Sequence, residues 1–295
     1  MKKYKKLTKN KFIYLLITLL ALTIFNFIDN KDNTSYAFNN DEVLTAHFID
    51  VNQGDANFIE LPNNKTILID SGEKEYGNKI LEYINNLGYN KIDYVIGTHP
   101  HSDHIGGLIE IVKNIDIDNI YMPKAKSNSP TYITLLKEIK NKNYQIHQAL
   151  NKTTILEDNN LKISILSPDN KEYKNLNNYS VVLKITYKNI SFLYMGDAEK
   201  EIEKELLKNN FNNLQADIIK IGHHGSNTSS TNEFINKVNA KYGVIEVGKN
   251  NIYDHPNNEI IKRWENHNTK IYRTDINGNI IIKTDGNNII IDKEK

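Results

Sequence analysis

A dense cluster of metal-binding residue types constrains this chain more than any other feature. The segment His99-Pro100-His101-Ser102-Asp103-His104 offers four ligand side chains within six residues. Alternate residues of extended backbone point the same way, so His99 and His101 can hold one ion. Asp103 and His104 can hold a neighbouring ion, and this donor set suits zinc or, in a more oxygen-rich site, manganese. A polar loop whose histidines bind only one another or solvent explains such density poorly. The cluster therefore predicts two divalent metal ions, with zinc as the first choice.

The apolar pattern around the cluster predicts alternating strands and helices. An apolar strand at 92–96 leads into the cluster, and 80–87 has apolar residues at helical spacing. Further strands are expected at 44–50, 56–61, 66–70, 162–166, 181–187, 191–195, 218–221, 242–247 and 270–273, the first three antiparallel, with further helices from about 131, at 198–207 and near 232 and 258. A chain of 295 residues with 39% hydrophobic content can bury the core of one α/β domain. Two sheets with helices outside fit this pattern.

The N-terminus has the pattern of an export signal. Its first eleven residues contain six lysines and no acidic residue, and a seventeen-residue apolar run follows at 12–28. Ser35-Tyr36-Ala37 places small residues at the positions that a signal peptidase requires. We expect a signal peptide in 1–37, with an uncleaved membrane anchor as the alternative, a linker in 38–42 and the functional domain in 43–295. Either alternative predicts an extracytoplasmic domain, secreted or anchored to the outer face of the membrane through residues 12–28.

Composition excludes several kinds of chemistry. The sequence contains no cysteine, which rules out disulfides, thiolate metal sites and a cysteine nucleophile. The net charge of the chain is +1, and residues 1–37, with seven lysines and two aspartates, carry +5. The remaining domain therefore carries −4, which makes it a poor general binder of polyanions.

Four segments in a fixed order resemble the metallo-β-lactamase superfamily. They are residues 67–72 (ILIDSG), 98–104 (THPHSDH), 194–198 (YMGDA) and 220–226 (KIGHHGS). More narrowly, residues 48–56 (FIDVNQGDA), the HHGS run and residues 253–256 (YDHP) resemble the hydrolase domain of DNA-internalisation competence proteins of the ComEC type. Phosphorylcholine esterases of the pneumococcal type share several of these motifs. The resemblance covers about residues 43–285 and implies an αββα sandwich of two mixed β-sheets flanked by helices.

The resemblance also implies roles for residues outside the cluster. Asp197 would bridge the two ions, since a carboxylate has two oxygens to share. His223 would complete the coordination of the second ion. Spacing leaves both His223 and His224 open as that ligand; we favour His223, the first of the two past the strand, and expect His224 to contact substrate or support a ligand.

Two positions depart from the family pattern. Many superfamily members place a further histidine before the bridging aspartate, but here the interval contains only His147, outside the expected place. Residues 177–180 (NNYS) occupy that place, as in competence-type domains. The first ion is therefore expected to be held more weakly, or to be completed by Asn178, water or substrate. The second departure is Asn52, where related chains often have glycine.

Several residues are candidates for supporting roles. Asp70 can accept the free N–H of a ligand histidine, which would fix its tautomer, although a plain strand-end turn is also open. Asp55 and His255 are candidates for the lining of the cleft, and Ser180 lies in the segment that replaces the missing histidine. For catalysis we expect Asp103 to orient the attacking water, and His224 or His255 to stabilise developing negative charge.

These features predict an exported, metal-dependent hydrolase of phosphodiesters, related to competence and resembling a nuclease, with DNA or a choline-phosphate polymer as substrate. A cell-wall phosphorylcholine esterase is the alternative enzyme, and it would need an aromatic cage for the choline cation. A surface binding module with structural metal is the non-enzymatic alternative, although structural zinc sites are usually closed by four protein ligands. The sequence indicates no protein partner.

Overall fold

The computed structural model describes residues 42–158 and 160–295, which belong to one compact unit. The signal peptide or anchor expected in 1–37, and all of the expected linker except residue 42, lie outside the described residues. Among the described residues, no helix has both the length and the apolar character needed to cross a membrane.

The first sheet has eight strands in the order β15-β14-β1-β2-β3-β4-β5-β6. Its strands are β1 (Leu44–Phe48), β2 (Asn57–Glu60), β3 (Thr66–Ile69), β4 (Lys91–Ile96), β5 (Asp116–Met122), β6 (Ile146–Gln148), β14 (Ile280–Thr284) and β15 (Ile289–Lys293). The predicted antiparallel arrangement of the first three strands is confirmed. From β3 to β6 the strands run parallel, so the sheet is mixed.

The second sheet has seven strands in the order β13-β12-β11-β10-β9-β8-β7. Its strands are β7 (Thr154–Glu157), β8 (Leu161–Ser167), β9 (Val182–Tyr187), β10 (Ile190–Tyr194), β11 (Ile218–Lys220), β12 (Tyr242–Ile245) and β13 (Lys270–Arg273). The strands from β7 to β10 are antiparallel, and those from β10 to β13 are parallel. This sheet is therefore mixed as well.

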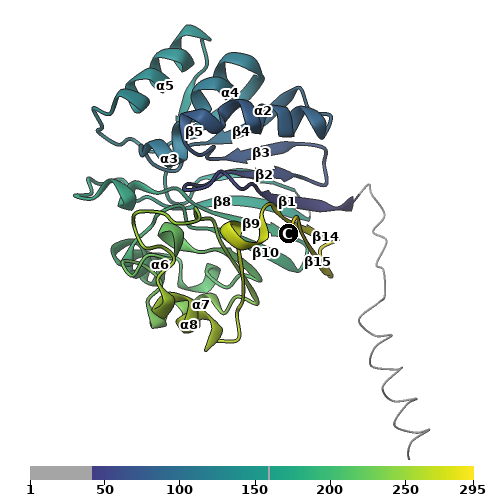
Figure 1. The fold of residues 1–295 in the computed structure, drawn as a ribbon, viewed down its shortest axis with the longest axis vertical. Coiled ribbons are helices and arrows are strands. Elements are labelled where there is room, and N and C mark those ends of the chain that lie inside the picture. The colour runs from purple at the N-terminus through teal and green to yellow at the C-terminus, as the bar shows by residue number, and fades with distance from the viewer. Residues whose placement is uncertain (1–41, 159) are drawn as a thin grey trace, which may run out of the picture. The chain divides into compact units, whose positions relative to one another are not determined.

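Helices cover the outer face of each sheet (Figure 1). The α-helices are α2 (Gly77–Asn86), α3 (Ser102–Ile105), α4 (Leu108–Asn114), α5 (Pro130–Asn141), α6 (Lys200–Asn209), α7 (Asn232–Val238), α8 (Asn258–Glu265) and α9 (Thr274–Asn277). The 3₁₀ helices are η2 (Lys74–Tyr76), η3 (Leu176–Tyr179), η4 (Phe211–Asn213) and η5 (Gly222–Gly225). In Figure 1, α2, α4 and α5 lie against the first sheet, and α6, α7 and α8 lie against the second. The expected αββα sandwich is confirmed.

Apolar side chains fill the space between the sheets and beneath each helical layer. Phe48 of the first sheet stacks on Tyr194 of the second, with ring centroids 5.8 Å apart, and both side chains are buried. Ile80 and Ile84 of α2 are buried in the core beneath the first helical layer, and Trp264 of α8 in that of the second. Burial of each such side chain stabilises the fold by roughly 1.5–3 kcal/mol, which fixes the two sheets face to face.

The parallel strands bring the polar sequence motifs together. Asp70 follows β3 and His99 follows β4, while Asp197 follows β10 and the pair His223 and His224 follows β11. Because neighbouring parallel strands end at the same edge of a sheet, loops from both sheets meet at one end of the sandwich.

Candidate metal centre

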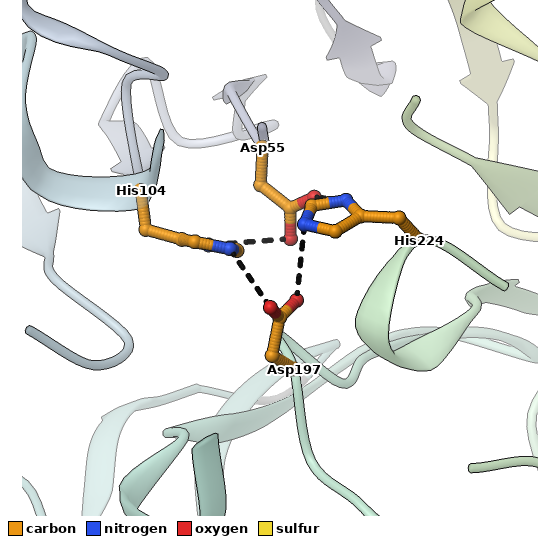
Figure 2. A group of neighbouring side chains, drawn as sticks. All are labelled: Asp55, His104, Asp197 and His224. Carbon is orange, nitrogen blue, oxygen red and sulfur yellow. Dashed lines mark ion pairs between the residues drawn. The ribbon is translucent and has the colours of Figure 1, made fainter. Parts of the chain in front are cut away.

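Donor atoms from four loops converge around Asp197 (Figure 2). Its Oδ2 lies 3.2 Å from Nε2 of His104, and its Oδ1 lies 3.5 Å from Nε2 of His224. The Asp103 carboxylate approaches the same point, with Oδ2 3.4 Å from Nε2 of His224 and 3.8 Å from Nε2 of His104. Burial raises the pKa of the Asp103 carboxyl, but His104 and His224 hold it well below its ordinary value. Asp103 is therefore a carboxylate that can bind a cation or accept a hydrogen bond from water.

A second group of donors shares Asp197. Nε2 of His99 lies 3.0 Å from Nδ1 of His101 and 3.8 Å from Oδ2 of Asp197. His99, His101 and Asp197 can thus hold one ion, while His104, His224 and Asp197 can hold another. The arrangement brings all four predicted cluster residues to the site and puts Asp197 where a bridging carboxylate would have to be.

Unpartnered buried atoms indicate that these residues fit divalent ions. Nε2 of His104, Nε2 of His224 and Oδ1 of Asp197 are buried and have no hydrogen-bond partner among the described residues. Leaving one buried polar atom unpaired costs about 1–3 kcal/mol, so three that converge on one point need a common partner. Imidazole nitrogen and carboxylate oxygen are donors that zinc and other divalent transition metals accept.

Asp70 binds His104 through the ring nitrogen that does not face Asp197. Its Oδ2 accepts a hydrogen bond from Nδ1 of His104 at 2.8 Å, and Thr98 donates to both carboxylate oxygens through its backbone N–H and its hydroxyl. With Nδ1 protonated, Nε2 of His104 keeps a free lone pair for a metal ion. The structure thus places Asp70 in the supporting position expected for it.

Asp55, a candidate for a supporting role or for the cleft lining, lies behind the histidines and outside the lining. Its carboxylate lies 3.3 Å from Nδ1 of His224 and 3.7 Å from Nδ1 of His104, and it forms an ion pair with the buried Lys220. Burial raises the pKa of Asp55, but Lys220 and His104 bring it below the ordinary value. Asp55 therefore remains charged and can orient both imidazole rings.

Lys220 and Glu246 also support the site, although the sequence did not predict a role for either. Nζ of Lys220 donates to the backbone oxygen of Gly196 at 3.1 Å and lies 4.0 Å from Oδ1 of Asp197. The backbone oxygen of Glu246 accepts Nδ1 of His224 at 2.8 Å. Burial and the nearby Asp55 raise the pKa of Glu246 to about 8. Only its position points to Lys220 in the sequence, because it ends an apolar strand shortly before the paired histidines.

A group of four residues has ligand atoms within 4.8 Å of one another: Asp55, His104, Asp197 and His224. The predicted ligand His223 is not among them. The His224 side chain is 2% exposed, and its Nδ1 is held by Glu246, as described above. His223 is 20% exposed, its Nδ1 pairs with Thr228 Oγ1 at 2.9 Å, and its Nε2 lies 3.8 Å from Asp197 Oδ2. The geometry therefore favours His224 over the predicted His223 as a ligand of the second ion.

Both histidines of this pair have left-handed backbone, which residue spacing alone does not reveal. His223 and His224 have φ of 50° and 51°, a conformation that costs side chains with a Cβ energy and that clusters at functional sites. Asp70 has φ of 58°, and Asn52 has φ of 57°, a conformation that asparagine tolerates better than most residues with a Cβ. At Gly54 no other residue would fit, because a Cβ there would lie 2.2 Å from the backbone oxygen of Asp103.

The segment that replaces the missing histidine has two different roles. Asn178 donates to Glu201 Oε2 at 3.0 Å and accepts the backbone N–H of Glu199, so its amide is used at the start of α6. Of the three candidates to complete the first ion, this leaves water and substrate. Ser180 Oγ accepts the backbone N–H of Asp197 at 3.0 Å and lies 3.4 Å from Nδ1 of His99. Ser180 therefore positions ligands of the first ion.

The metal centre opens into a cleft of about 480 Å³. Its lining includes His101, Asp103, Asp197, His224, His255 and Tyr253. Burial and the proximity of His223 and His224 lower the pKa of His255 to about 4. Its imidazole is therefore neutral at neutral pH, and its buried Nδ1 has no hydrogen-bond partner among the described residues.

The assignment of His224 as ligand predicts unequal effects of the same substitution at the paired histidines. His224→Gln should weaken the binding of one ion by more than the ~10–100-fold typical of residues that only support a ligand, and His223→Gln should weaken it less. Metal content after dialysis against graded chelator measures both. The two positions share the left-handed backbone, which makes each variant the control for the other. Greater metal loss in His223→Gln would return the ligand role to that residue.

Comparison with known proteins agrees with this geometry. Residues 49–248 match the metallo-beta-lactamase superfamily. The chain is 32% identical over 249 residues to ComE operon protein 3 of Bacillus subtilis (strain 168), covering 79% of this chain and 32% of that protein. It is 27% identical over 216 residues to competence protein ComA of Neisseria gonorrhoeae, covering 73% of this chain and 29% of that protein. The chain spans about a third of the length of the curated relatives that it matches.

Solved structures share the fold at low sequence identity. CmlA, a diiron beta-hydroxylase from Streptomyces venezuelae, superimposes with a TM-score of 0.55 at 12% identity, over 82% of this chain and 54% of that one. Igni18, a metallo hydrolase from Ignicoccus hospitalis, superimposes with a TM-score of 0.51 at 14% identity, over 85% of this chain and all of that one (100%). The fold, the ordered motifs and the matched region together establish that this chain belongs to the metallo-β-lactamase superfamily, as a hydrolase that resembles the ComEC-type competence proteins.

Proposed function

We propose that this chain is a phosphodiesterase with two metal ions, an exported protein that acts on nucleic acid outside the cytoplasm. The observation that carries the proposal is the pair of donor groups that share Asp197 and open into one cleft. Two ions held there would supply a hydroxide nucleophile at neutral pH and positive charge for the attacking and leaving oxygens of a phosphodiester.

The side chains of the cleft have separate tasks in this proposal. The ionised Asp103, which lines the cleft, accepts a hydrogen bond from the attacking water and orients it. The neutral His255 lines the cleft, and a ring N–H there can donate to a phosphoryl oxygen as charge develops. His224 acts as a metal ligand in place of the charge-stabilising role expected from the sequence.

The choice of phosphodiesters rests on two arguments. Two relatives that match most of this chain are named ComE operon protein 3 and competence protein ComA, and a two-ion site is suited to in-line displacement at phosphorus. Because this chain matches about a third of those relatives, we carry over the chemistry of the site and not the activities of the whole proteins. Export is proposed from the lysine-rich start and the apolar run at 12–28 alone.

The two alternatives have less support. A choline esterase needs an aromatic cage, but among the described residues the cleft lining includes Tyr253 as its one tyrosine, and Trp264 is fully buried in the core. A structural metal site would be closed, whereas His101, Asp103 and Asp197 all line an open cleft.

The test is turnover by the full chain after chelation and reloading with zinc or manganese. Bis-p-nitrophenyl phosphate, single-stranded DNA and p-nitrophenyl phosphorylcholine serve as substrates, and His101→Ala as the inactive variant. We expect metal-dependent cleavage of the first two substrates, lost in the variant. Preference for the choline ester would favour the esterase. A folded protein that contains metal and cleaves none of the three would overturn the proposal.

A further inference from the structure

Aromatic rings lead from the metal centre to the edge of the cleft. The imidazole of His255 lies 6.4 Å from that of His224, with 32° between the ring planes. The ring of Tyr253 lies 5.8 Å from that of His255, with 25° between the planes. Both Tyr253 and His255 line the cleft. A planar group that follows a phosphate bound at the metal centre would thus find a tyrosine ring already stacked on a histidine.

The loop that carries Tyr253 is held in place by one asparagine. Nδ2 of Asn251 donates to the backbone oxygens of Gly248 and His255, at 3.0 and 2.6 Å, and its Oδ1 accepts the backbone N–H groups of Tyr253 and His255, both at 3.1 Å. The loop also packs on the paired-histidine turn, because a Cβ on Gly225 would lie 2.6 Å from Cβ of Pro256. The position of Tyr253 is therefore fixed by the fold.

Exposure at this loop is unusual for an apolar side chain. The Tyr253 side chain is 59% exposed and that of Ile252 is 91% exposed. They are two of six exposed large hydrophobic residues in the described part of the chain, and the only two that are adjacent in sequence. Exposed apolar surface beside a cleft marks a place where a ligand binds. The outer face of Tyr253 is available for stacking.

We infer that Tyr253, backed by His255, stacks a nucleobase of the substrate, so the substrate class is a single-stranded nucleic acid. Stacking suits this domain because the residues after 37 carry a net charge of −4, and backbone electrostatics alone would bind a polyanion weakly. Every base has a π-face, so one tyrosine accepts a strand of any sequence. Bases of a duplex stack on one another and have no free face to offer. This inference rests on the proposed function and specifies its substrate.

The test compares a base-bearing strand with a baseless strand of equal charge. The substrates are oligothymidylate and an abasic oligodeoxyribophosphate of the same length, with an oligouridylate arm to distinguish DNA from RNA as the source of the base. The full chain should show a KM for oligothymidylate roughly 10–100-fold below that for the abasic strand, the size expected for stacking on one aromatic side chain. Tyr253→Ala should reduce this ratio to about one, and Tyr253→Phe should keep it. Ile276→Ala, a change at another exposed hydrophobic residue, serves as the control and should leave the ratio unchanged.

Equilibrium binding separates this inference from the proposed function. Fluorescence anisotropy of labelled oligothymidylate should show weaker binding to Tyr253→Ala than to the unaltered chain, whether or not the strand is cleaved. If no strand were cleaved but Tyr253→Ala still bound oligothymidylate more weakly, the proposed phosphodiesterase activity would be overturned and the stacking site would be supported. Equal KM values for the two strands would overturn the inference, as would equal binding of oligothymidylate to Tyr253→Ala and to the unaltered chain. A Tyr253→Phe variant as impaired as Tyr253→Ala would overturn it too.

Discussion

Asp197→Ala is expected to abolish turnover and to lower the affinity for both ions together. Asp197 is the residue that the two donor groups share, with Oδ2 near His99 and His104 and Oδ1 near His224. Residues that only support a ligand typically cost ~10–100-fold in metal affinity or activity when they are changed, so the loss at a shared ligand should exceed that range. Metal content after dialysis and turnover of bis-p-nitrophenyl phosphate measure the two effects.

The fold should survive this substitution. Asp197 lies after β10, and the cores under the two helical layers do not depend on its carboxylate. Circular dichroism of the metal-free variant should match that of the metal-free parent, and Asp118→Ala, at an exposed carboxylate on β5, should retain both ions. A variant that keeps one ion at full affinity would argue against a shared ligand. If Asp197→Ala failed to fold while the metal-free parent stayed folded, Asp197 would have a structural role in the fold.

Much of the fold could be predicted because its strands are strongly apolar and end at turn residues. The expected strand at 92–96 is β4, and the expected strands at 181–187 and 191–195 are the antiparallel pair β9 and β10. β5 was not predicted, because Asp116 and Asp118 alternate with its buried residues and resemble a polar loop. β7 is an edge strand with exposed ends, and its pattern is equally weak. Apolar periodicity identifies strands buried on both faces better than strands with one solvated face.

The candidate site could be predicted where ligands are close in sequence and not where they meet through the fold. The density of residues 99–104 was sufficient to identify the cluster, and Asp70 could be placed by its position after a strand. The choice between His223 and His224 depends on a left-handed turn that spacing does not encode. Lys220 meets Asp55, and Glu246 accepts the backbone N–H of the adjacent Ala56, only because β11, β12 and the loop after β1 lie together beneath the site. Such buried pairs follow from the topology of both sheets and leave no local pattern.

Lys220→Met is expected to be the most destabilising single change at the buried charges beneath the site. The Lys220 side chain is 1% exposed and the Asp55 side chain 2%, and they form an ion pair. Removing one partner of a buried pair leaves an uncompensated charge and typically costs about 3–5 kcal/mol of unfolding free energy. Urea denaturation in the presence of a chelator measures this cost without a contribution from bound metal.

The same pair gives the stability a defined dependence on pH. Burial lowers the pKa of Lys220, but Asp55, Asp197 and Glu246 raise it above its ordinary value of 10.5. A group whose pKa is raised by folding contributes stability below its unfolded pKa and loses it as the pH rises through the folded value. The difference between the parent and Lys220→Met should therefore be constant only from neutral pH to about 8, where the neighbouring Glu246 titrates, and the contribution of the lysine charge should be lost above about 10.5.

A double variant separates loss of the ion pair from loss of packing. In Lys220→Met/Asp55→Asn no buried charge is left without its partner, so a substantial part of the lost stability should return, whereas a pure packing defect at Lys220 would be unchanged. Lys162→Met, at the exposed pair with Glu157, is the matched control, and its effect should be small because solvent screens surface pairs. If the double variant were as unstable as Lys220→Met, the uncompensated charge of Asp55 would not be the cause, and the role of Lys220 would lie in its contact with Gly196.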